Sequence, residues 1–205
     1  MRTFETKIPE VIVIKSDMYK DERGFFSELV NIESLKEIGV EFKLVQVNHS
    51  YNINAGTLRG LHFQVKPFEQ TKIVTCLKGA IFDVAVDIRP KSKTFLKFIT
   101  FLISSPEIDL VTIQSEIAQD VDFKIIYPDK VLIPKGFAHG YLTLVPSTEV
   151  LYFTDNMYSK DHDRTIRFDD PQIGITWPKV GGALTLSTKD ANAPLLGEID
   201  FSQLT

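Results

Sequence analysis

Apolar and polar residues alternate in short runs along most of the chain. A period of two is typical of β-strands that bury one face. The runs that we interpret as strands lie at 9–15, 25–29, 44–50, 58–64, 73–75, 80–88, 95–103 and 124–133. Two more, at 140–145 and 149–155, flank Pro146 and are predicted to form a hairpin. The pattern therefore predicts about ten short strands, which favours a β-sandwich or jelly roll.

One segment has the features of a helix. Residues 31–38 begin with Asn31, a residue type that caps helices well, and continue with helical spacing. The segment 104–124 is acidic and only weakly periodic, so we interpret it as an excursion from the strands. The chain contains no repeat and no linker of low complexity, and we expect one domain over residues 1–205.

Composition narrows the range of partners. The chain is 43% hydrophobic and 24% charged, a balance typical of soluble globular proteins. Its net charge of -4 gives no electrostatic basis for non-specific binding to nucleic acid. The N-terminus lacks the apolar core of a signal peptide, and the longest apolar run, 98–103, is too short to span a membrane. The single Cys76 rules out an intrachain disulfide, so we expect a cytoplasmic protein without a membrane or nucleic-acid partner.

Residues that suit chemistry gather in two segments. The first, 56–72, contains Arg59, His62 and Lys72 in β-type surroundings. The second, 134–140, contains His139. Alternation places His62 and Gln64 on the same face of a strand. A lone histidine on such a face is most simply a core residue bonded to the backbone. Two histidines in such segments instead suggest a shared site.

The first interpretation of that site is a metal centre. The residues before His62 and before His139 resemble the two motifs of the cupins, jelly rolls in which these segments are adjacent strands. Cupins that bind metal carry another histidine at the position of Gln64, and an amide is a poor ligand for most transition metals. The remaining candidate set is His62, Glu69 and His139. We therefore expect no metal and no cofactor.

Two other interpretations do without a metal. Removing a proton from a carbon next to a carbonyl requires a base with a pKa near 7 and a group that stabilises the enolate oxygen. His62 suits the first role and Lys72 the second, and a carboxylate behind the histidine would orient it. Arg23 and Arg59 suit the binding of phosphates. Alternatively, the same residues would serve a sugar- or nucleotide-binding jelly roll that has no catalytic base.

Seven motifs, in order along the chain, are similar to those of the dTDP-4-dehydrorhamnose 3,5-epimerases. They extend over residues 4–197 and are Asp21-x-Arg23-Gly24-x-Phe26-x-Glu28, Gln46-x-Asn48-x-Ser50, Gly56-x-Leu58-Arg59-Gly60-Leu61-His62-x-Gln64, Gln70-x-Lys72, Asp83-Val84-Ala85-Val86-Asp87-Ile88-Arg89, Gly136-Phe137-Ala138-His139-Gly140 and Leu186-Ser187-x-Lys189-Asp190. The resemblance implies an all-β, cupin-type double-stranded β-helix (jelly roll) with a few short helices, acting as a homodimer without a metal. It further implies an isomerase that inverts C3 and/or C5 of a nucleotide-linked 4-keto-6-deoxy sugar through an enolate, in deoxysugar and polysaccharide precursor biosynthesis.

The resemblance also implies roles for individual residues. By position, His62 is the expected base, Asp190 its carboxylate partner and Tyr152 the proton donor. Lys72 is the fourth expected catalytic group, beside the sugar. The residues expected to contact the substrate are Arg23, Phe26, Glu28, Gln46, Asn48, Arg59, His139, Asp163 and Lys189. The first three of these are expected to reach the site of the partner subunit.

Two departures from the family pattern leave the substrate open. The segment 104–124 is longer than the usual connection, and Phe153 and Met157 stand where the family commonly has a lysine and an aromatic residue. The sequence does not decide between dTDP, GDP and CDP, or between C3, C5 and both. A single-carbon epimerase, a ketoisomerase on the same fold and a metal-dependent cupin enzyme stay as alternatives.

Overall fold

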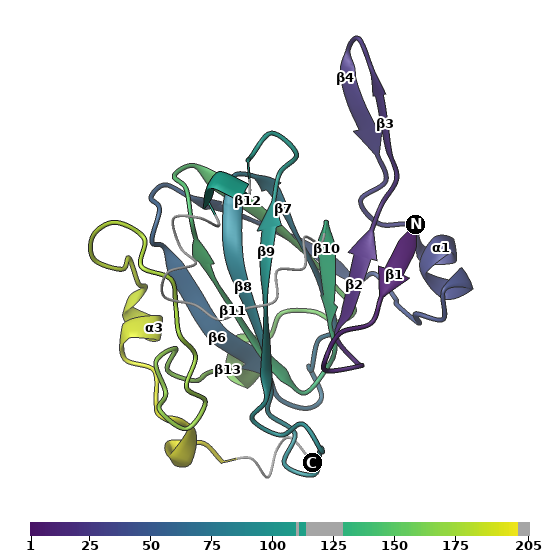
Figure 1. Ribbon diagram of the computed structural model, residues 1–205. Coiled ribbons are helices and arrows are strands. Elements are labelled where there is room, and N and C mark those ends of the chain that lie inside the picture. The colour runs from purple at the N-terminus through teal and green to yellow at the C-terminus, as the bar shows by residue number, and fades with distance from the viewer. Residues whose placement is uncertain (110, 114–128, 201–205) are drawn as a thin grey trace.

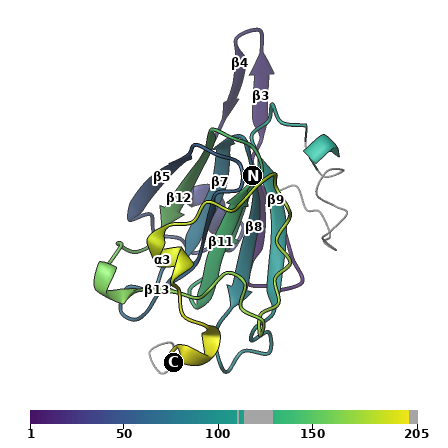
Figure 2. The same cartoon turned by 90° about the vertical axis from the view of Figure 1, so that its left-hand side faces the viewer.

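Two antiparallel sheets lie face to face in the computed structural model, which describes residues 1–109, 111–113 and 129–200 (Figure 1, Figure 2). The first sheet has the order β1 (Arg2–Phe4), β2 (Ile12–Lys15), β10 (Lys130–Ile133), β7 (Lys72–Lys78), β12 (Thr148–Thr154) and β5 (Gln46–Asn52). The second has the order β13 (Asp163–Thr165), β6 (Leu58–Gln64), β11 (Phe137–Thr143), β8 (Ala80–Asp87) and β9 (Phe98–Ser104). Most neighbouring strands are distant in sequence, as in a jelly roll, so the predicted fold class is confirmed.

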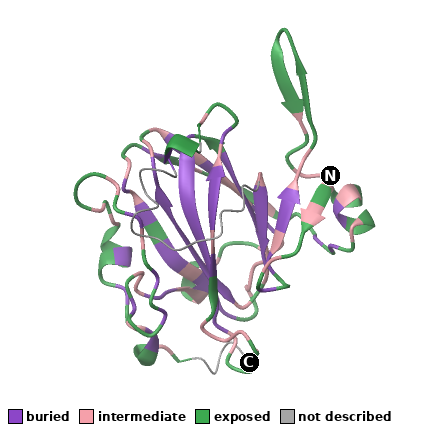
Figure 3. Ribbon diagram, viewed as in Figure 1, coloured by how far each residue is buried: buried purple, intermediate pink, exposed green. Residues whose placement is uncertain are grey.

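A hairpin of β3 (Met18–Asp21) and β4 (Gly24–Ser27) projects from this sandwich (Figure 1). Both strands are almost entirely exposed, and Figure 3 shows the hairpin as a green extension above the purple sheets. Isolated two-stranded hairpins are marginally stable in water. Among the residues that the structure describes, the hairpin therefore lacks the packing that normally stabilises such an element.

The helices are short. The predicted helix is confirmed as α1 (Ile32–Glu37), where the side chain of Asn31 accepts a hydrogen bond from the backbone N–H of Ser34 at 3.1 Å. The other helical turns whose full bounds lie within the described residues are η1 (Lys160–His162), α3 (Thr188–Ala191) and η2 (Leu196–Glu198). None of the described helices is long and apolar enough to cross a membrane.

Burial on both faces of the second sheet explains why every residue of β8 is buried. Phe82, Val84 and Val86 pack with the C-terminal segment, which includes Trp177, on the outer face of this sheet. Ile81 and Ala85 point the other way, into the core between the two sheets. A third cluster packs α1 against the outer face of the first sheet. Alternating side chains of one strand thus join two of the three apolar layers.

The predicted hairpin at 140–155 is wrong. Strand β11 pairs with β6 and β8, whereas β12 pairs with β5 and β7 in the other sheet. The turn at Pro146 therefore carries the chain from one sheet to the other. The strand predicted at 95–103 begins only at Phe98, because Leu96 adopts a positive φ of 61°. The parts of 104–124 and 124–133 at 110 and 114–128 lie outside the described residues.

Candidate active site

The pairing of β6 with β11 brings the two histidine segments together. His62 lies directly opposite His139 in the register, which confirms that the two segments are adjacent strands. The ladder then shifts, because between His62 and Arg59 two residues of β6, Gly60 and Leu61, correspond to one residue of β11, Gly140. This β-bulge lets both residues face the same cavity although their spacing is odd.

Gly60 makes the bulge possible. Its φ of 141° belongs to a region that favours glycine, and a Cβ there would lie 2.5 Å from the Cα of Gly140. The two backbones approach each other too closely for any side chain at this point. The glycines of both motifs therefore serve the geometry of the cavity wall.

A cavity of about 340 Å³ opens at the edge of the sandwich, between the two sheets. Strands β5, β7 and β12 contribute one wall, and β6, β11 and β13 the other. The residues that line it are Asn48, Ser50, Arg59, His62, Gln64, Gln70, Lys72, His139, Tyr141, Tyr152, Thr154, Tyr158 and Asp163. Seven of the predicted site residues are in that set: Asn48, Arg59, His62, Lys72, His139, Tyr152 and Asp163.

His62 is paired with Asp190, as predicted. Nε2 of His62 lies 2.5 Å from Oδ1 of Asp190, which is only 2% exposed. Ser187, the N-cap of α3, donates from its hydroxyl to Oδ2 of Asp190 at 2.8 Å and accepts from its backbone N–H at 3.1 Å. Burial alone would raise the pKa of Asp190, but the contacts with His62 and Ser187 outweigh it and hold the pKa below its ordinary value. Asp190 is therefore ionised, and Nδ1 of His62 is left for a reacting group.

Lys72 lies on the opposite wall, at the start of β7. Removal of its ammonium from bulk water lowers its pKa to about 8, against the opposing attraction of Asp163 and Asp83. The side chain thus remains mainly cationic at pH 7. A charge in so confined a place interacts more strongly with a neighbouring anion than it would in water.

Tyr152 extends into the same cavity from β12, on the wall opposite His62. Burial raises its pKa well above the ordinary value, and the neighbouring Tyr141 raises it further. Its ring packs edge-on against His139, with 6.0 Å between the centroids. The phenol therefore keeps its proton at neutral pH and is available as a donor.

His139 is held by a buried carboxylate. Its Nε2 lies 2.6 Å from Oδ2 of Asp83 on β8, and both side chains are almost completely buried. Oδ1 of Asp83 has no hydrogen-bond partner among the described residues. Asp83 therefore fixes the orientation of the His139 ring at the back of the cavity.

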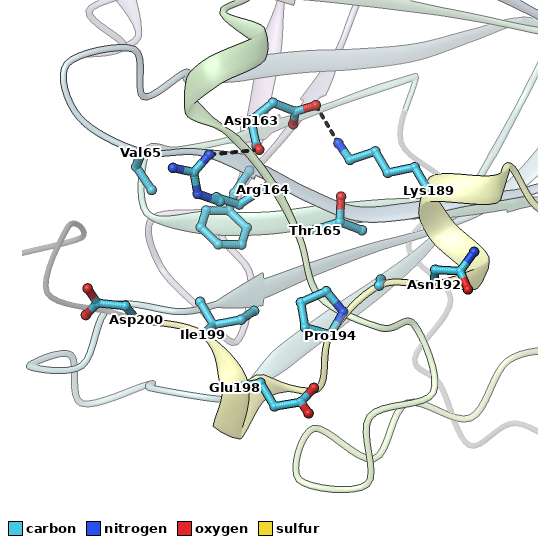
Figure 4. Close-up of a pocket in the computed structure, with 12 residues that line it drawn as sticks. Val65, Asp163, Arg164, Thr165, Lys189, Asn192, Pro194, Glu198, Ile199 and Asp200 are labelled. Atoms are coloured by element: carbon cyan, nitrogen blue, oxygen red, sulfur yellow. Dashed lines mark hydrogen bonds and ion pairs between the residues drawn. The ribbon is translucent and has the colours of Figure 1, made fainter.

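Polar side chains in and around the cavity form hydrogen-bonded pairs. Arg59 donates through Nε to Oδ1 of Asn52 at 2.8 Å, and Gln46 donates to Oδ1 of Asn48 at 2.6 Å. On the other side, Lys189 donates to Oδ2 of Asp163 at 2.5 Å, as Figure 4 shows. Gln46 and Lys189 thus lie beside the cavity, one contact away from residues that line it.

A larger cavity of about 490 Å³ shares Asp163 with the first cavity and is also lined by Lys189 (Figure 4). Its walls otherwise come from Phe63, Pro194 and neighbours in the C-terminal segment, and neither His62 nor His139 lines it. The chemistry therefore belongs to the smaller cavity.

Arg23, Phe26 and Glu28 lie on or just after the projecting hairpin, and none of them lines the cavity. Phe26 is 69% exposed, and Arg23 forms an ion pair with Asp21 on the same hairpin. The expectation that these three residues reach a partner's site stays a prediction.

Several residues of the site were not predicted. Tyr141, Tyr158, Gln70 and Thr154 line the cavity, and Ser187 supports Asp190. Gln70 and Ser187 stand in two of the seven motifs, as Ser50 does in a third, but the motifs assign them no role of their own. Tyr141 resembles a core residue, but its hydroxyl reaches Oγ of Ser50 at 3.0 Å.

The described residues contain no group of three histidine, cysteine or acidic side chains placed to hold a metal ion. Nε2 of His62 and Nε2 of His139 each contact a carboxylate instead. The amide of Gln64 is engaged by backbone groups. The donor set considered for a metal therefore does not fit one in this arrangement.

Comparisons with known proteins agree with the geometry. The family model described as dTDP-4-dehydrorhamnose 3,5-epimerase matches residues 5–121 and 127–198. Proteins of that name from Sinorhizobium fredii and Escherichia coli are each 38% identical to the chain; the alignments cover 95% and 97% of this chain and 89% and 96% of theirs. Among solved structures, dTDP-6-deoxy-D-glucose-3,5-epimerase from Legionella pneumophila, in complex with dTDP-4-keto-L-rhamnose, is 36% identical with a TM-score of 0.83, covering 97% of this chain and 94% of that one. The Bacillus anthracis enzyme, with TDP and PPi bound, is 38% identical with a TM-score of 0.81, covering 95% and 99%.

Proposed function

The chain belongs to the dTDP-4-dehydrorhamnose 3,5-epimerase family, and from this premise we propose that it inverts both C3 and C5 of a dTDP-linked 4-keto-6-deoxy sugar. The observation that carries the proposal is the placement of the His62–Asp190 pair and Tyr152 on opposite walls of one cavity, with Lys72 on the same wall as Tyr152. The ligands named for the Legionella and Bacillus structures support dTDP as the nucleotide. The product would serve deoxysugar biosynthesis.

Proton removal is assigned to His62. The hydrogens on C3 and C5 are weakly acidic because the C4 carbonyl can accept the electrons that each leaves behind. With Nε2 facing Asp190, Nδ1 of His62 takes the proton. The ionised Asp190 then stabilises the positive charge on the imidazole ring.

Stabilisation of the enolate is assigned to Lys72. Electron density moves to the oxygen on C4, where a cation is most effective in a confined site. The lowered pKa of about 8 still leaves Lys72 charged at neutral pH. It also brings the ammonium closer in acidity to an enol, which favours sharing of a proton.

Return of the proton is assigned to Tyr152. Inversion requires a donor on the face of the sugar opposite the base, and Tyr152 comes from the opposite wall. Its raised pKa keeps the phenol protonated until the carbanion forms. One arrangement serves C3 and C5 because both carbons flank the same carbonyl.

Binding of the rest of the substrate is assigned to the rim. Arg59 and Lys189 offer positive charge for the diphosphate, and Gln46 and Asn48 offer amides for the nucleotide. His139 and Asp163 line the cavity and face the sugar. These contacts orient the carbonyl between His62 and Tyr152.

A homodimer completes the proposal. The hairpin of β3 and β4 is exposed along both strands, including Phe25 and Phe26 at its end. We assign a second copy of the chain as its cover, with Arg23, Phe26 and Glu28 contributing to that copy's site. The enzyme is proposed to act in the cytoplasm, where its single buried Cys76 would stay reduced.

The test is to supply dTDP-, GDP- and CDP-4-keto-6-deoxy sugars in deuterated water and to locate the label by NMR. Deuterium at both C3 and C5 of the dTDP sugar, with inverted products, is the expected result. Label at one carbon alone would indicate a single-carbon epimerase. A 3-keto product would indicate a ketoisomerase.

A further inference from the structure

Gln64 contributes to the cavity wall, but the proposed reaction gives it no role. It ends β6, shares a face with His62 and is only 5% exposed. Buried amides in protein interiors are normally fully hydrogen-bonded, so the partners of this side chain indicate what it does.

Backbone groups of two loops form hydrogen bonds with both the nitrogen and the oxygen of the Gln64 amide. Nε2 of Gln64 donates to the carbonyl oxygens of Phe68 at 2.6 Å and Met157 at 3.0 Å. Oε1 accepts from the backbone N–H of Ser159 at 2.6 Å. A primary amide has only two N–H donors, so Gln64 has no hydrogen left for a substrate. If the amide were turned so that its nitrogen and oxygen exchanged places, the amide oxygen would face the carbonyl oxygens of Phe68 and Met157, and none of these three atoms can donate a hydrogen bond.

The loop held in this way, residues 155–159, is also bound by other side chains. Gln70 donates to the carbonyl of Asn156 at 2.9 Å, and Gln46 accepts from the backbone N–H of Tyr158 at 3.0 Å. Gln64 differs in its position, since it grips the backbone on both sides of Tyr158. The backbone conformation of Tyr158 is therefore fixed by the hydrogen bonds that Gln64 makes to the residues before and after it.

Tyr158 lies at the mouth of the cavity. Its side chain is 54% exposed, lines the opening and donates to Oδ2 of Asp163 at 3.1 Å. A fixed aromatic ring at an opening supplies contact area at a low cost in conformational entropy.

We propose that Gln64 is a positioning residue that holds the loop 155–159 and, through Tyr158, sets the affinity of the site for its nucleotide-linked ligand. The proposal rests on the proposed function only for the identity of that ligand. It predicts an effect on binding rather than on the chemical step.

Gln64→Glu tests the donors at constant size. At neutral pH the new carboxylate has no hydrogen to donate and faces two carbonyl oxygens. We expect KM for the sugar nucleotide and Kd for dTDP to rise about tenfold or more, because two hydrogen bonds are lost, while kcat stays within about threefold. As the pH is lowered, the carboxyl gains a proton and can donate to one of the two carbonyl oxygens again, so the Kd ratio of variant to wild type should narrow.

The Kd ratio of variant to wild type is used because other titratable groups line the cavity in both proteins, and their effect on Kd cancels in the ratio. The titratable and charged side chains that line the same cavity are Arg59, His62, Lys72, His139, Tyr141, Tyr152, Tyr158 and Asp163. Gln64→Met removes all three bonds without adding charge, and its Kd ratio should be raised at every pH by a similar factor. Gln172→Glu, at an exposed glutamine outside the cavity, should leave KM and Kd unchanged.

A readout without any ligand separates this proposal from the proposed function. The backbone N–H of Ser159 should exchange with solvent about tenfold faster in Gln64→Met than in wild type, because its acceptor is gone. If the wild type did not bind dTDP, the proposed identity of the nucleotide would be wrong, but the role of Gln64 in holding the loop would not be contradicted. Unchanged exchange at Ser159, or a loss confined to kcat with KM unaltered, would overturn the role of Gln64.

Discussion

Nε2 of His62 and Oδ1 of Asp190 lie 2.5 Å apart although the residues are separated by 128 positions in the chain. The contact joins the central strand of one motif to a single helical turn near the C-terminus. Because Ser187 fixes the carboxylate in turn, the imidazole is oriented before any substrate arrives. Preorganisation of this kind is what an acid–base mechanism requires.

Replacing the carboxylate should remove most of the activity. Asp190→Asn keeps the size and the bond to Ser187 but provides no negative charge for the imidazolium. We expect kcat to fall about 10²- to 10³-fold with little change in KM, as for other oriented bases. Steady-state kinetics on the dTDP-4-keto sugar would measure this. Asp161→Asn, at an exposed acid, is the matched control and should behave as wild type; equal losses in both variants would contradict the pairing.

Inversion and exchange should separate in Tyr152→Phe. Without the phenol, His62 can still remove a proton and return it to the same face. We expect solvent deuterium to enter the sugar while inversion falls about 10²-fold or more. NMR of the product in deuterated water distinguishes the two processes, and His62→Asn should abolish both. Intact inversion in Tyr152→Phe would show that another group is the donor.

Lys72 should lower the stability of the enzyme that it serves. Its pKa is about 8 in the folded protein and about 10.4 in an unfolded chain, so between these values the unfolded state binds more protons. Stability of the wild type therefore rises as pH increases across this window. Lys72→Met should be more stable at pH 7 by roughly 1–3 kcal/mol, and the gain should shrink toward pH 10.5.

Denaturant unfolding at a series of pH values would measure that gain, and kinetics should show the variant to be nearly inactive. Lys43→Met, at an exposed lysine, should show neither the gain nor its pH dependence. A variant less stable than wild type at pH 7 would mean that Lys72 is not penalised by burial. Wild-type activity should also decline above about pH 8, as the ammonium loses its proton.

The hairpin should matter for assembly and affinity together. Phe26→Ala should raise KM for the sugar nucleotide by about tenfold while kcat stays similar, if Phe26 contacts a site in the partner. Sedimentation should show a dimer for the wild type. Phe4→Ala removes another exposed aromatic ring, on β1, and should leave KM unchanged. A fully active monomer would contradict the shared site.

Chelation should not affect turnover. The two histidines of the site contact Asp83 and Asp190, and Gln64 is engaged by backbone, so the reaction as proposed uses side chains alone. We expect unchanged kcat after prolonged treatment with a strong chelator, and no stoichiometric transition metal by elemental analysis. Activity that disappears on chelation and returns with added metal would restore the metal-cupin interpretation.

The sequence predicted which side chains share a face of a strand better than it predicted which strands pair with each other. Alternation placed His62 and Gln64 on one face of a strand, and both line the cavity, because a period of two is a local property of the chain. It could not show that β11 and β12 belong to different sheets, since both outcomes leave the same alternation.

The site was harder to predict from the residues alone. Asp190 entered only through the resemblance, because no local pattern links it to His62. Tyr141 lies in the predicted strand 140–145, where a tyrosine is most simply interpreted as a buried core residue, and Tyr158 lies in a loop without periodicity. The engagement of Gln64 depends on three backbone groups in two loops, and backbone groups leave no trace in a sequence.

In β6, the bulge at Gly60 changes the bend of the strand without changing which side chains face the core and which face the cavity. Without this one residue, β6 would read Leu58, Arg59, Leu61, His62 in strict alternation, with leucines toward the core and functional side chains toward the cavity. Gly60 therefore adds no side chain and changes no face; it adds bend to the strand. Deleting it would keep the inventory of the site and alter only its shape. A catalytic surface of this kind can be reshaped along its length without exchanging any of its functional groups.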